Sequence, residues 1–255
     1  SGGTISNLNT DIMDADMVDA NIDKFKFLCY NYYNMYEILP STLIELAKMM
    51  PKPLYIVGGA VRNFLIDRSL STDIDLAGAI PADEFLGVLN ALGIEKKAVY
   101  PRTGTVMFND GDYNYEYTAF RRETYINGKH QPETTEFTED IAEDALRRDF
   151  KCNAIYYDIT GKKIIDILGG VSDIENKILD TVCEPDKVFS VDGLRLMRLA
   201  RFAGELNFKP TYAVMQSAKK YADNILDISP ERIYSELKMI LVSDCKYTFS
   251  DKMGH

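Results

Sequence analysis

The sequence predicts an α+β fold, in which a mixed or antiparallel sheet flanked by helices is followed by an all-helical region. From Leu54 onward, short β-type runs alternate with stretches of helical periodicity, a pattern typical of a mixed sheet covered by helices. After Gly169 and Gly170 the strand patterns fade, and helical patterns continue to residue 243. We therefore expect a domain boundary near residue 180.

The expected elements follow in chain order. Residues 1–40 are polar and acidic at first and then rich in tyrosine, which indicates a loose leader. The segment Leu43–Met50 has helical apolar spacing that two prolines end. Between Arg121 and Phe137 lies a polar stretch without periodicity, too long for an ordinary connection and therefore either functional or mobile. The β-type runs are Leu54–Val57, Asp73–Ala77, Ala98–Tyr100, Thr105–Phe108, Tyr113–Ala119 and Ala154–Asp158.

Three helices are expected in the second half. Ser229 and Pro230 provide an N-cap and a first helical residue for the last of them. The three helices span 184–206, 211–224 and 230–243. The sequence thus divides into a leader over 1–40, a head domain over 41–180 and a helical domain over 181–255.

Composition limits the classes of function. Of the 255 residues, 46% are hydrophobic and 27% are charged, as in soluble globular proteins. The net charge of −10 argues against nonspecific nucleic-acid binding, so a polyanion could bind only at local basic clusters such as Arg147-Arg148. No apolar run approaches the roughly 18–20 residues that cross a bilayer, and no secretory signal is evident, so a cytoplasmic protein is expected. Four dispersed cysteines without a CxxC pair indicate reduced thiols.

A glycine turn follows the first expected strand. Gly58 and Gly59 stand between that strand and a helix, where a phosphate could approach the backbone N–H groups, and Arg62 would add a charge one turn later. A glycine pair after a strand is more often a tight turn, so this motif alone is weak.

Two carboxylates follow on the next strand. Asp73 and Asp75 lie two residues apart and therefore on one face, whereas Ile74 and Leu76 face the core. Two neighbouring carboxylates repel each other unless cations lie between them, and oxygen ligands suit Mg²⁺. The alternative is a solvent-facing strand edge, but the spacing after the glycine turn leaves room for one helix and favours a metal site.

A third carboxylate is available at Glu116. Alternation in the run 113–118 places Asn114, Glu116 and Thr118 on one face and three tyrosines on the other. If this strand neighbours the one that carries Asp75, Glu116 completes a three-carboxylate group that could hold two metal ions. The alternative is an exposed glutamate on a half-buried strand.

These motifs resemble the class II tRNA nucleotidyltransferases and bacterial poly(A) polymerases, within the polymerase-β-like nucleotidyltransferase superfamily. The resemblance spans roughly residues 40–243. It rests on Gly58-Gly59-Ala60-Val61-Arg62 with Asp73 and Asp75, Phe120-Arg121 to Tyr125, Arg147-Arg148-Asp149-Phe150 with Asn153-Ala154, Asp192-Gly193-Leu194-Arg195 with Arg198, Arg201 and Phe202, and Glu231-Arg232-Ile233 with Glu236-Leu237.

The resemblance implies a metal-dependent enzyme. A catalytic head would hold two Mg²⁺ ions and a helical neck would select the incoming nucleotide, so that CMP and AMP are added to the 3′ end of tRNA from CTP and ATP with release of pyrophosphate. The stretch 121–137 matches a loop thought to help switch specificity from CTP to ATP. The implied catalytic residues are Asp73, Asp75 and Glu116, with Asp73 and Asp75 as metal ligands, and the implied nucleotide-binding residues are Gly58, Gly59, Arg62, Arg148, Asp149, Asp192, Arg195, Arg198 and Arg201.

Asp192 and Arg195 have residue types that suit base selection. Three residues apart on a helix, they would share one face as acceptor and donor. Cytosine and adenine both present an amino donor beside a ring-nitrogen acceptor, which this pair matches, whereas guanine and uracil present the reverse order. The alternative is a weak intrahelical ion pair. Arg198 and Arg201 follow on a largely apolar helix, and buried arginines need an anion, either a triphosphate or an acidic partner.

Some positions depart from the family. Asn63 stands where an acidic residue is usual, Lys151-Cys152 where Thr-Ile is common, and Val191 where Glu often precedes the base-selecting aspartate, which puts its orientation in doubt. The chain also stops at His255, where such enzymes usually continue into body and tail helices, so a truncated protein or one with a smaller RNA is expected.

The motifs leave three functions open. A poly(A) polymerase or an A-adding enzyme shares them with a CCA-adding enzyme. A catalytically silent RNA-binding module is a different class, and the repulsive pair Asp73 and Asp75 argues against it.

Overall fold

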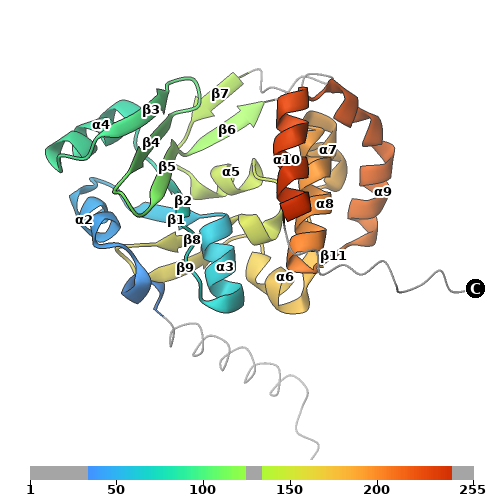
Figure 1. The fold of residues 1–255 in the computed structure, drawn as a ribbon, viewed down its shortest axis with the longest axis horizontal. Helices are drawn as coiled ribbons and strands as arrows, with labels where there is room; N and C mark the ends of the chain where they lie inside the picture. The colour runs from blue at the N-terminus through green and yellow to red at the C-terminus, as the bar shows by residue number, and fades with distance from the viewer. Residues whose placement is uncertain (1–33, 125–133, 243–255) are drawn as a thin grey trace, which may run out of the picture.

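The computed structural model describes residues 34–124 and 134–242. Its central feature is one mixed sheet (Figure 1). The strands of this sheet are β1 (Leu54–Val57), β2 (Asp73–Gly78), β3 (Lys96–Tyr100), β4 (Thr105–Asn109), β5 (Asn114–Ala119), β8 (Ile155–Asp158) and β9 (Lys163–Asp166). Their order is β3-β4-β5-β2-β1-β8-β9, with β2 and β5 parallel and the other neighbours antiparallel.

Helices surround this sheet and form the C-terminal part of the chain. The helices and 3₁₀ turns are η1 (Met35–Ile38), α2 (Ser41–Met49), α3 (Gly59–Asp67), α4 (Ala82–Ala91), α5 (Ile141–Leu146), η2 (Lys151–Asn153), α6 (Gly170–Asn176), α7 (Pro185–Val191), α8 (Leu194–Leu206), α9 (Tyr212–Lys220), η3 (Ala222–Asp227) and α10 (Pro230–Val242). Two small sheets complete the fold, and they pair β6 (Arg121–Thr124) with β7 (Thr134–Phe137) and β10 (Ile178–Leu179) with β11 (Lys209–Pro210).

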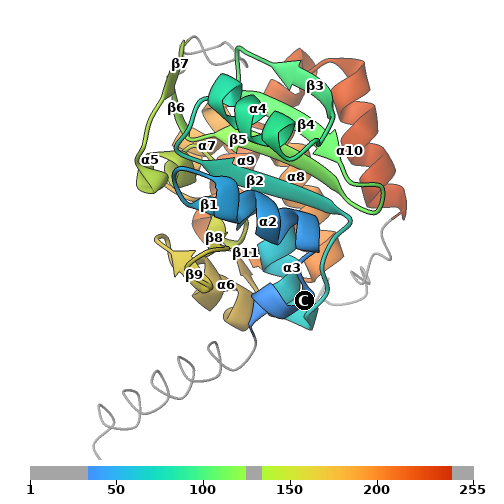
Figure 2. The same ribbon diagram turned by 90° about the vertical axis from the view of Figure 1, so that its left-hand side faces the viewer.

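One face of the sheet is apolar because the strand residues alternate. Ile74, Leu76, Tyr115 and Tyr117 are all buried in a core that includes α2 and α4, and the Tyr117 ring stacks on Phe85 at 3.8 Å between centroids. Figure 2 shows α2 and α4 in front of the sheet and the C-terminal helices behind it. The opposite face of β2 and β5 is left to polar side chains, and this face carries the candidate site.

A second core joins the C-terminal helices to the sheet. Phe150 meets Phe202 of α8 edge to face, with ring centroids 5.8 Å apart, and both side chains are buried. Tyr156 of β8 and Phe189 of α7 belong to the same cluster. The head and the helices therefore share apolar packing, which holds α8 next to the polar face of the sheet.

The predicted fold class is confirmed, as are the six expected strands and the helix near 43–50. The expected leader 1–40 lies mostly outside the described residues, but Met35 and Leu39 are packed in the first core. The strand β9 was not predicted because its four residues, Lys163–Asp166, do not alternate between polar and apolar side chains. The ends of the polar stretch 121–137 form the hairpin β6–β7 instead of an irregular connection, and residues 125–133 lie outside the described part.

The expected continuous helix over 184–206 is wrong, because the chain breaks at Asp192 and Gly193. Asp192 is extended, with φ −148° and ψ 107°, and α8 starts only at Leu194. The break lets the chain pass close to η3, where a Cβ atom on Gly193 would overlap the backbone carbonyl of Asn224. In the described parts of the chain, no helix has the length and apolar character that crossing a bilayer requires.

This close approach predicts a stability difference between two glycines. Gly193→Ala should lower the free energy of unfolding by about 1–3 kcal/mol, because the added methyl group must displace the backbone at Asn224. Gly87→Ala, in α4, meets no atom within 4 Å and should leave stability unchanged or raise it, since alanine favours a helix. Urea denaturation of both variants checks this, and equal effects would contradict the packing described at the break.

Candidate functional site

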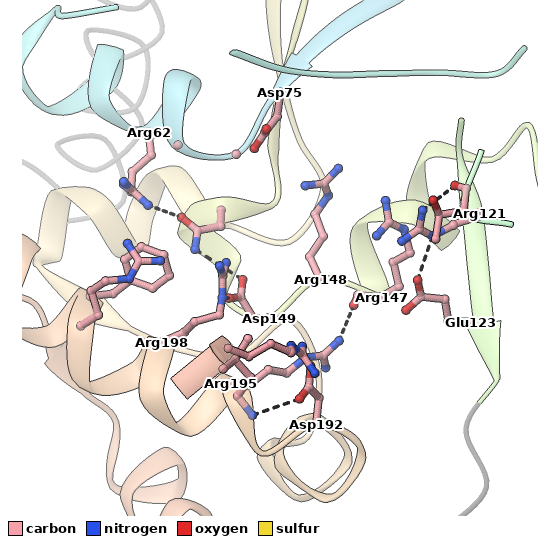
Figure 3. A pocket seen from close by; sticks show the side chains of 18 of the residues that line it. Arg62, Asp75, Arg121, Glu123, Arg147, Arg148, Asp149, Asp192, Arg195 and Arg198 are labelled. Atoms are coloured by element: carbon pink, nitrogen blue, oxygen red, sulfur yellow. Dashed lines mark hydrogen bonds and ion pairs between the residues drawn. The ribbon is translucent and has the colours of Figure 1, made fainter. Parts of the chain in front are cut away.

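A cavity of about 730 Å³ lies between the polar face of the sheet and helices α8 and α10 (Figure 3). Nine arginines line it, and they are Arg62, Arg102, Arg121, Arg147, Arg148, Arg195, Arg198, Arg201 and Arg232. Four carboxylates accompany them, and they are Asp75, Glu123, Asp149 and Asp192. The cavity is therefore locally cationic in a chain of net charge −10, and it suits a polyanionic ligand.

The structure places Asp75 and Glu116 side by side on β2 and β5. In the parallel register Asp75 lies opposite Glu116 and Asp73 lies opposite Asn114, whose Nδ2 donates to Asp73 Oδ1 at 3.0 Å. Exclusion of water by the surrounding protein raises the pKa of Asp75, whereas the positive charges of Arg148 and Arg198 lower it. Burial and the neighbouring Asp75 raise the pKa of Glu116. The charge of Asp75 thus disfavours that of Glu116, and the charge of Asp73 disfavours that of Asp75.

This carboxylate pair fits a divalent cation. Over residues 34–124 and 134–242, no three Asp, Glu, His or Cys side chains are grouped as a complete metal-binding set, so Asp73, Asp75 and Glu116 do not by themselves form one. Mg²⁺ commonly takes one or two carboxylates and completes its shell with water and substrate phosphates. The mutual repulsion of Asp75 and Glu116 is the property that a bound cation would relieve.

The glycine turn touches the same carboxylate. Gly58 has φ +76°, a backbone region that side chains with a Cβ rarely adopt. A Cβ at Gly58 would lie 3.2 Å from Asp75 Oδ2, because Val57 pairs with Asp75 across β1 and β2. Gly59 opens α3 and also lines the cavity. Glycine is thus required where the backbone passes the carboxylate.

Arg62 lies one turn into α3 and is buried. Its Nη1 donates to Asn153 Oδ1 at 2.5 Å, and its Nε and Nη2 donate to Asn63 Oδ1 at 3.2 and 3.0 Å. The guanidinium also lies 4.9 Å from the ring centroid of Phe202 on α8. Asn63, which departs from the family pattern, therefore helps to orient this arginine.

Asp144 was missed by sequence reasoning. It is completely buried on α5 and accepts hydrogen bonds from Arg147 Nε at 2.7 Å, Arg148 Nη2 at 3.0 Å and Tyr156 Oη at 2.7 Å. Burial would raise the pKa of Asp144, but Arg148 and Arg147 hold it at about 2. The spacing i, i+3 and i, i+4 from Asp144 to the two arginines is the signal that could have revealed it.

The arginines of α8 form ion pairs with acidic side chains. Arg198 Nε lies 2.6 Å from Asp149 Oδ2, and Arg201 Nε lies 2.7 Å from Oε2 of the buried Glu236 on α10. Burial would raise the pKa of Asp149, but Arg198 and Arg195 hold it at about 2. The expectation that these buried arginines need an anion is thus met in part within the protein, and Glu236 is a partner to which the sequence assigned no role.

Asp192 and Arg195 both line the cavity, but the expectation that they share one helix is wrong, because Asp192 precedes α8. Asp192 Oδ1 accepts from the Leu194 N–H at 3.0 Å, and Oδ2 lies 3.1 Å from Arg232 Nη2 of α10. Arg195 Nη2 donates to the carbonyl of Arg147 at 2.8 Å. Instead of pairing with each other, the two side chains are held by separate partners on the wall of the cavity (Figure 3).

A smaller cavity of about 300 Å³ adjoins the first and contains Glu116. The two cavities share Asp75, Thr103, Arg121, Arg147 and Arg148. Asp75 therefore lies where the two cavities meet.

Known proteins share this head and these helices. Residues 54–180 match the family described as "Poly A polymerase head domain", and residues 207–253 match "Probable RNA and SrmB-binding site of polymerase A". The fold thus has the form of a poly(A) polymerase head domain followed by helices. The chain belongs to the family of poly(A) polymerases and tRNA nucleotidyltransferases.

Curated relatives include the CCA-adding enzyme of Anoxybacillus flavithermus, which is 34% identical over 79% of this chain and 49% of the relative. The CCA-adding enzyme of a Geobacillus species is 36% identical over 73% of this chain and 45% of the relative. The Bacillus stearothermophilus CCA-adding enzyme in complex with CTP aligns with a TM-score of 0.69 and 31% identity, covering 78% of this chain and 47% of the other. A tRNA nucleotidyltransferase complexed with a primer tRNA and an incoming ATP analog aligns with a TM-score of 0.65 and 28% identity, covering 79% and 56%. The chain spans about half the length of the curated relatives it matches.

The low pKa of the two buried aspartates predicts an acid-labile site. Asp144 and Asp149 are charged in the fold down to about pH 2, so their stabilisation is complete above pH 4–5 and is lost as the pH falls toward 2. Asp144→Asn should flatten the dependence of the unfolding free energy on pH in this window, by on the order of 2 kcal/mol. Chemical denaturation at several pH values measures this. Asp223→Asn at an exposed position serves as the control, and an equal flattening there would contradict the prediction.

Proposed function

We propose that this chain is the head and neck of an enzyme that adds CMP and AMP to the 3′ end of tRNA from CTP and ATP. The observation that carries the proposal is that Asp75 and Glu116 stand beside an arginine-lined cavity whose far wall presents Asp192 and Arg195. The two CCA-adding relatives and the homologous structure with CTP support it. The head is proposed to span residues 41–180 and the neck 181–255.

The triphosphate is proposed to bind among the arginines nearest the glycine turn. Arg62 is oriented by two asparagines and Arg148 by Asp144, so their guanidiniums are fixed before a ligand arrives. The N–H groups at Gly58 and Gly59 lie at the start of α3, where a phosphate is favoured. Arg198 and Arg201 retain donors beyond those used by Asp149 and Glu236.

Base selection is assigned to Asp192 and Arg195. A carboxylate oxygen can accept the amino group of cytosine or adenine, and a guanidinium N–H can donate to the adjacent ring nitrogen. Guanine and uracil would place an acceptor against the carboxylate and a donor against the guanidinium. The resulting loss of binding free energy is largest where water is excluded. The N–H of Leu194 and the carbonyl of Arg147 hold the pair in place. Arg232 also contacts Asp192 and helps to orient it.

The reaction is an in-line displacement. The 3′-hydroxyl oxygen of the RNA forms a bond to the α-phosphorus, the bond from that phosphorus to the bridging oxygen breaks, and pyrophosphate leaves. Glu116, whose pKa is raised by burial and by the neighbouring Asp75, is placed to accept the hydroxyl proton. Mg²⁺ held by Asp73 and Asp75, with Glu116 adjacent, would supply charge neutralisation at the phosphates.

An A-adding enzyme or a poly(A) polymerase would use the same residues. A silent RNA-binding module would not, since the carboxylate pair lowers its own stability and gives nothing to RNA binding. The product therefore separates these functions.

Nucleotide incorporation tests the proposal directly. Transcripts of tRNA that end before CCA, after C and after CC are each incubated with one labelled NTP and Mg²⁺. We expect C on the first two ends and A on the third, with UTP and GTP used at least about 100-fold less efficiently. Addition of A to the CC end alone would indicate an A-adding enzyme, long A tails would indicate a poly(A) polymerase, and no addition would contradict the proposal.

Removal of the β2 carboxylates should separate activity from folding. Asp73→Ala combined with Asp75→Ala should lower transfer at least about 1,000-fold, because charge stabilisation at the phosphates is lost. The melting temperature should stay the same or rise, since the fold raises the pKa of Asp75 and so disfavours its charge. Asp83→Ala, at an exposed position on α4, is the matched control. Full activity of the double variant would rule out the assignment.

A further inference from the structure

The smaller cavity has a chemistry different from that of the larger one. All the arginines that line it are shared with the larger cavity. Its own wall is formed by Val57, Leu76, Tyr100, Thr105, Glu116 and Thr118. A ligand there meets an aromatic ring, hydroxyl groups and two carboxylates in addition to the three shared arginines, so this space offers contacts for a base and a sugar that the larger cavity lacks.

Three threonine hydroxyls form a row along this wall. Thr103 Oγ1 donates to Thr105 Oγ1 at 2.9 Å, and Thr105 Oγ1 lies 3.2 Å from Thr118 Oγ1. Each hydroxyl can donate as well as accept, which matches the hydroxyls of a ribose. Thr118 lies two residues after Glu116 on the same face of β5, so the row leads toward the carboxylates.

Tyr100 stands at the end of β3 with 51% of its surface exposed. The turn that follows it is fixed, because Arg121 Nη1 donates to the Thr103 carbonyl at 2.6 Å and the Phe137 ring packs against Gly104. Tyr100 thus offers a large aromatic surface on a fixed support beside the cavity. Such surfaces stack on nucleic-acid bases without regard to their identity.

We propose that the smaller cavity binds the 3′-terminal nucleotide of the acceptor RNA, with Tyr100 stacked on its base and the threonine row facing its ribose. This inference rests on the proposed function. That reaction needs two substrates on opposite sides of Asp75, and the larger cavity accounts for only one of them. The terminal base also changes as nucleotides are added, so contacts that tolerate any base suit this position better than hydrogen-bond recognition.

The experiment measures RNA and CTP binding separately. A 5′-labelled acceptor stem-loop that ends before CCA is titrated with the protein at low salt and followed by fluorescence anisotropy, and CTP is titrated in parallel. Tyr100→Ala should weaken binding of the stem-loop about fivefold or more, as expected for the loss of one stacked base. Tyr100→Phe should stay within about twofold of the wild type, because it keeps the ring. The control is Tyr212→Ala on α9, where the side chain is 80% exposed and lines neither cavity.

A modified RNA tests the contact itself. A stem-loop whose last nucleotide lacks its base should bind equally to the wild type and to Tyr100→Ala, since the partner of the ring is gone. Likewise, a 2′-deoxy terminus should weaken binding to the wild type and not to Thr118→Val. CTP affinity should be unchanged in the Tyr100 variants.

Two results would overturn the inference. Tyr100→Ala could bind the intact stem-loop as the wild type does, or it could lose CTP affinity instead, which would assign the cavity to the nucleotide. Failure of the proposed function is a separate result, because the binding titrations do not depend on incorporation. If the wild type is inactive but Tyr100→Ala weakens RNA binding, the RNA contact is supported and the proposed reaction is contradicted.

Discussion

The parallel pairing of β2 with β5 is the constraint on which the rest of the site depends. This register places Asp75 directly opposite Glu116, so two carboxylates share one polar face while their strand neighbours fill the core behind them. The glycine turn reaches the same carboxylate through the antiparallel pairing of β1 with β2, which brings Gly58 against Asp75 in a backbone conformation that favours glycine. A sheet with another strand order would separate Asp75, Glu116 and the glycine turn, and the arginines would no longer lie around them.

Around this pair, buried carboxylates are neutralised by arginines. Asp144 and Glu236 are buried, and each binds arginines that retain further donors toward the cavity. The centroid of the Phe202 ring lies 4.9, 5.1 and 4.1 Å from the guanidiniums of Arg62, Arg198 and Arg201, so one aromatic ring contacts three cations from two parts of the chain. The cationic cavity is thus built on fixed supports, which lowers the ordering cost when a polyanion binds.

Local sequence patterns predicted most of the sheet and the polar face. The alternation in Asp73–Leu76 and in Asn114–Thr118 appears directly as exposed and buried residues, because a strand side chain has only two directions. The break at Asp192 and Gly193 was not predicted in this way, since helical periodicity continues across it and the close approach of Gly193 to Asn224, 31 residues further along, is not contained in a local pattern. The pairing of Glu236 was not predicted for the same reason: its partner Arg201 lies on another helix, and helical periodicity contains no information about neighbouring helices.

The raised pKa of Asp75 and Glu116 has a consequence for cation binding. Protons and divalent cations compete for the same oxygens. Because the pKa values of Asp75 and Glu116 are raised, these carboxylates take up protons at a higher pH than free carboxylates do. The cation concentration needed to saturate the site should therefore increase as the medium becomes more acidic. At the proposed cation site, acidification and a lower magnesium concentration would therefore act in the same direction, since both leave the carboxylates without the cation.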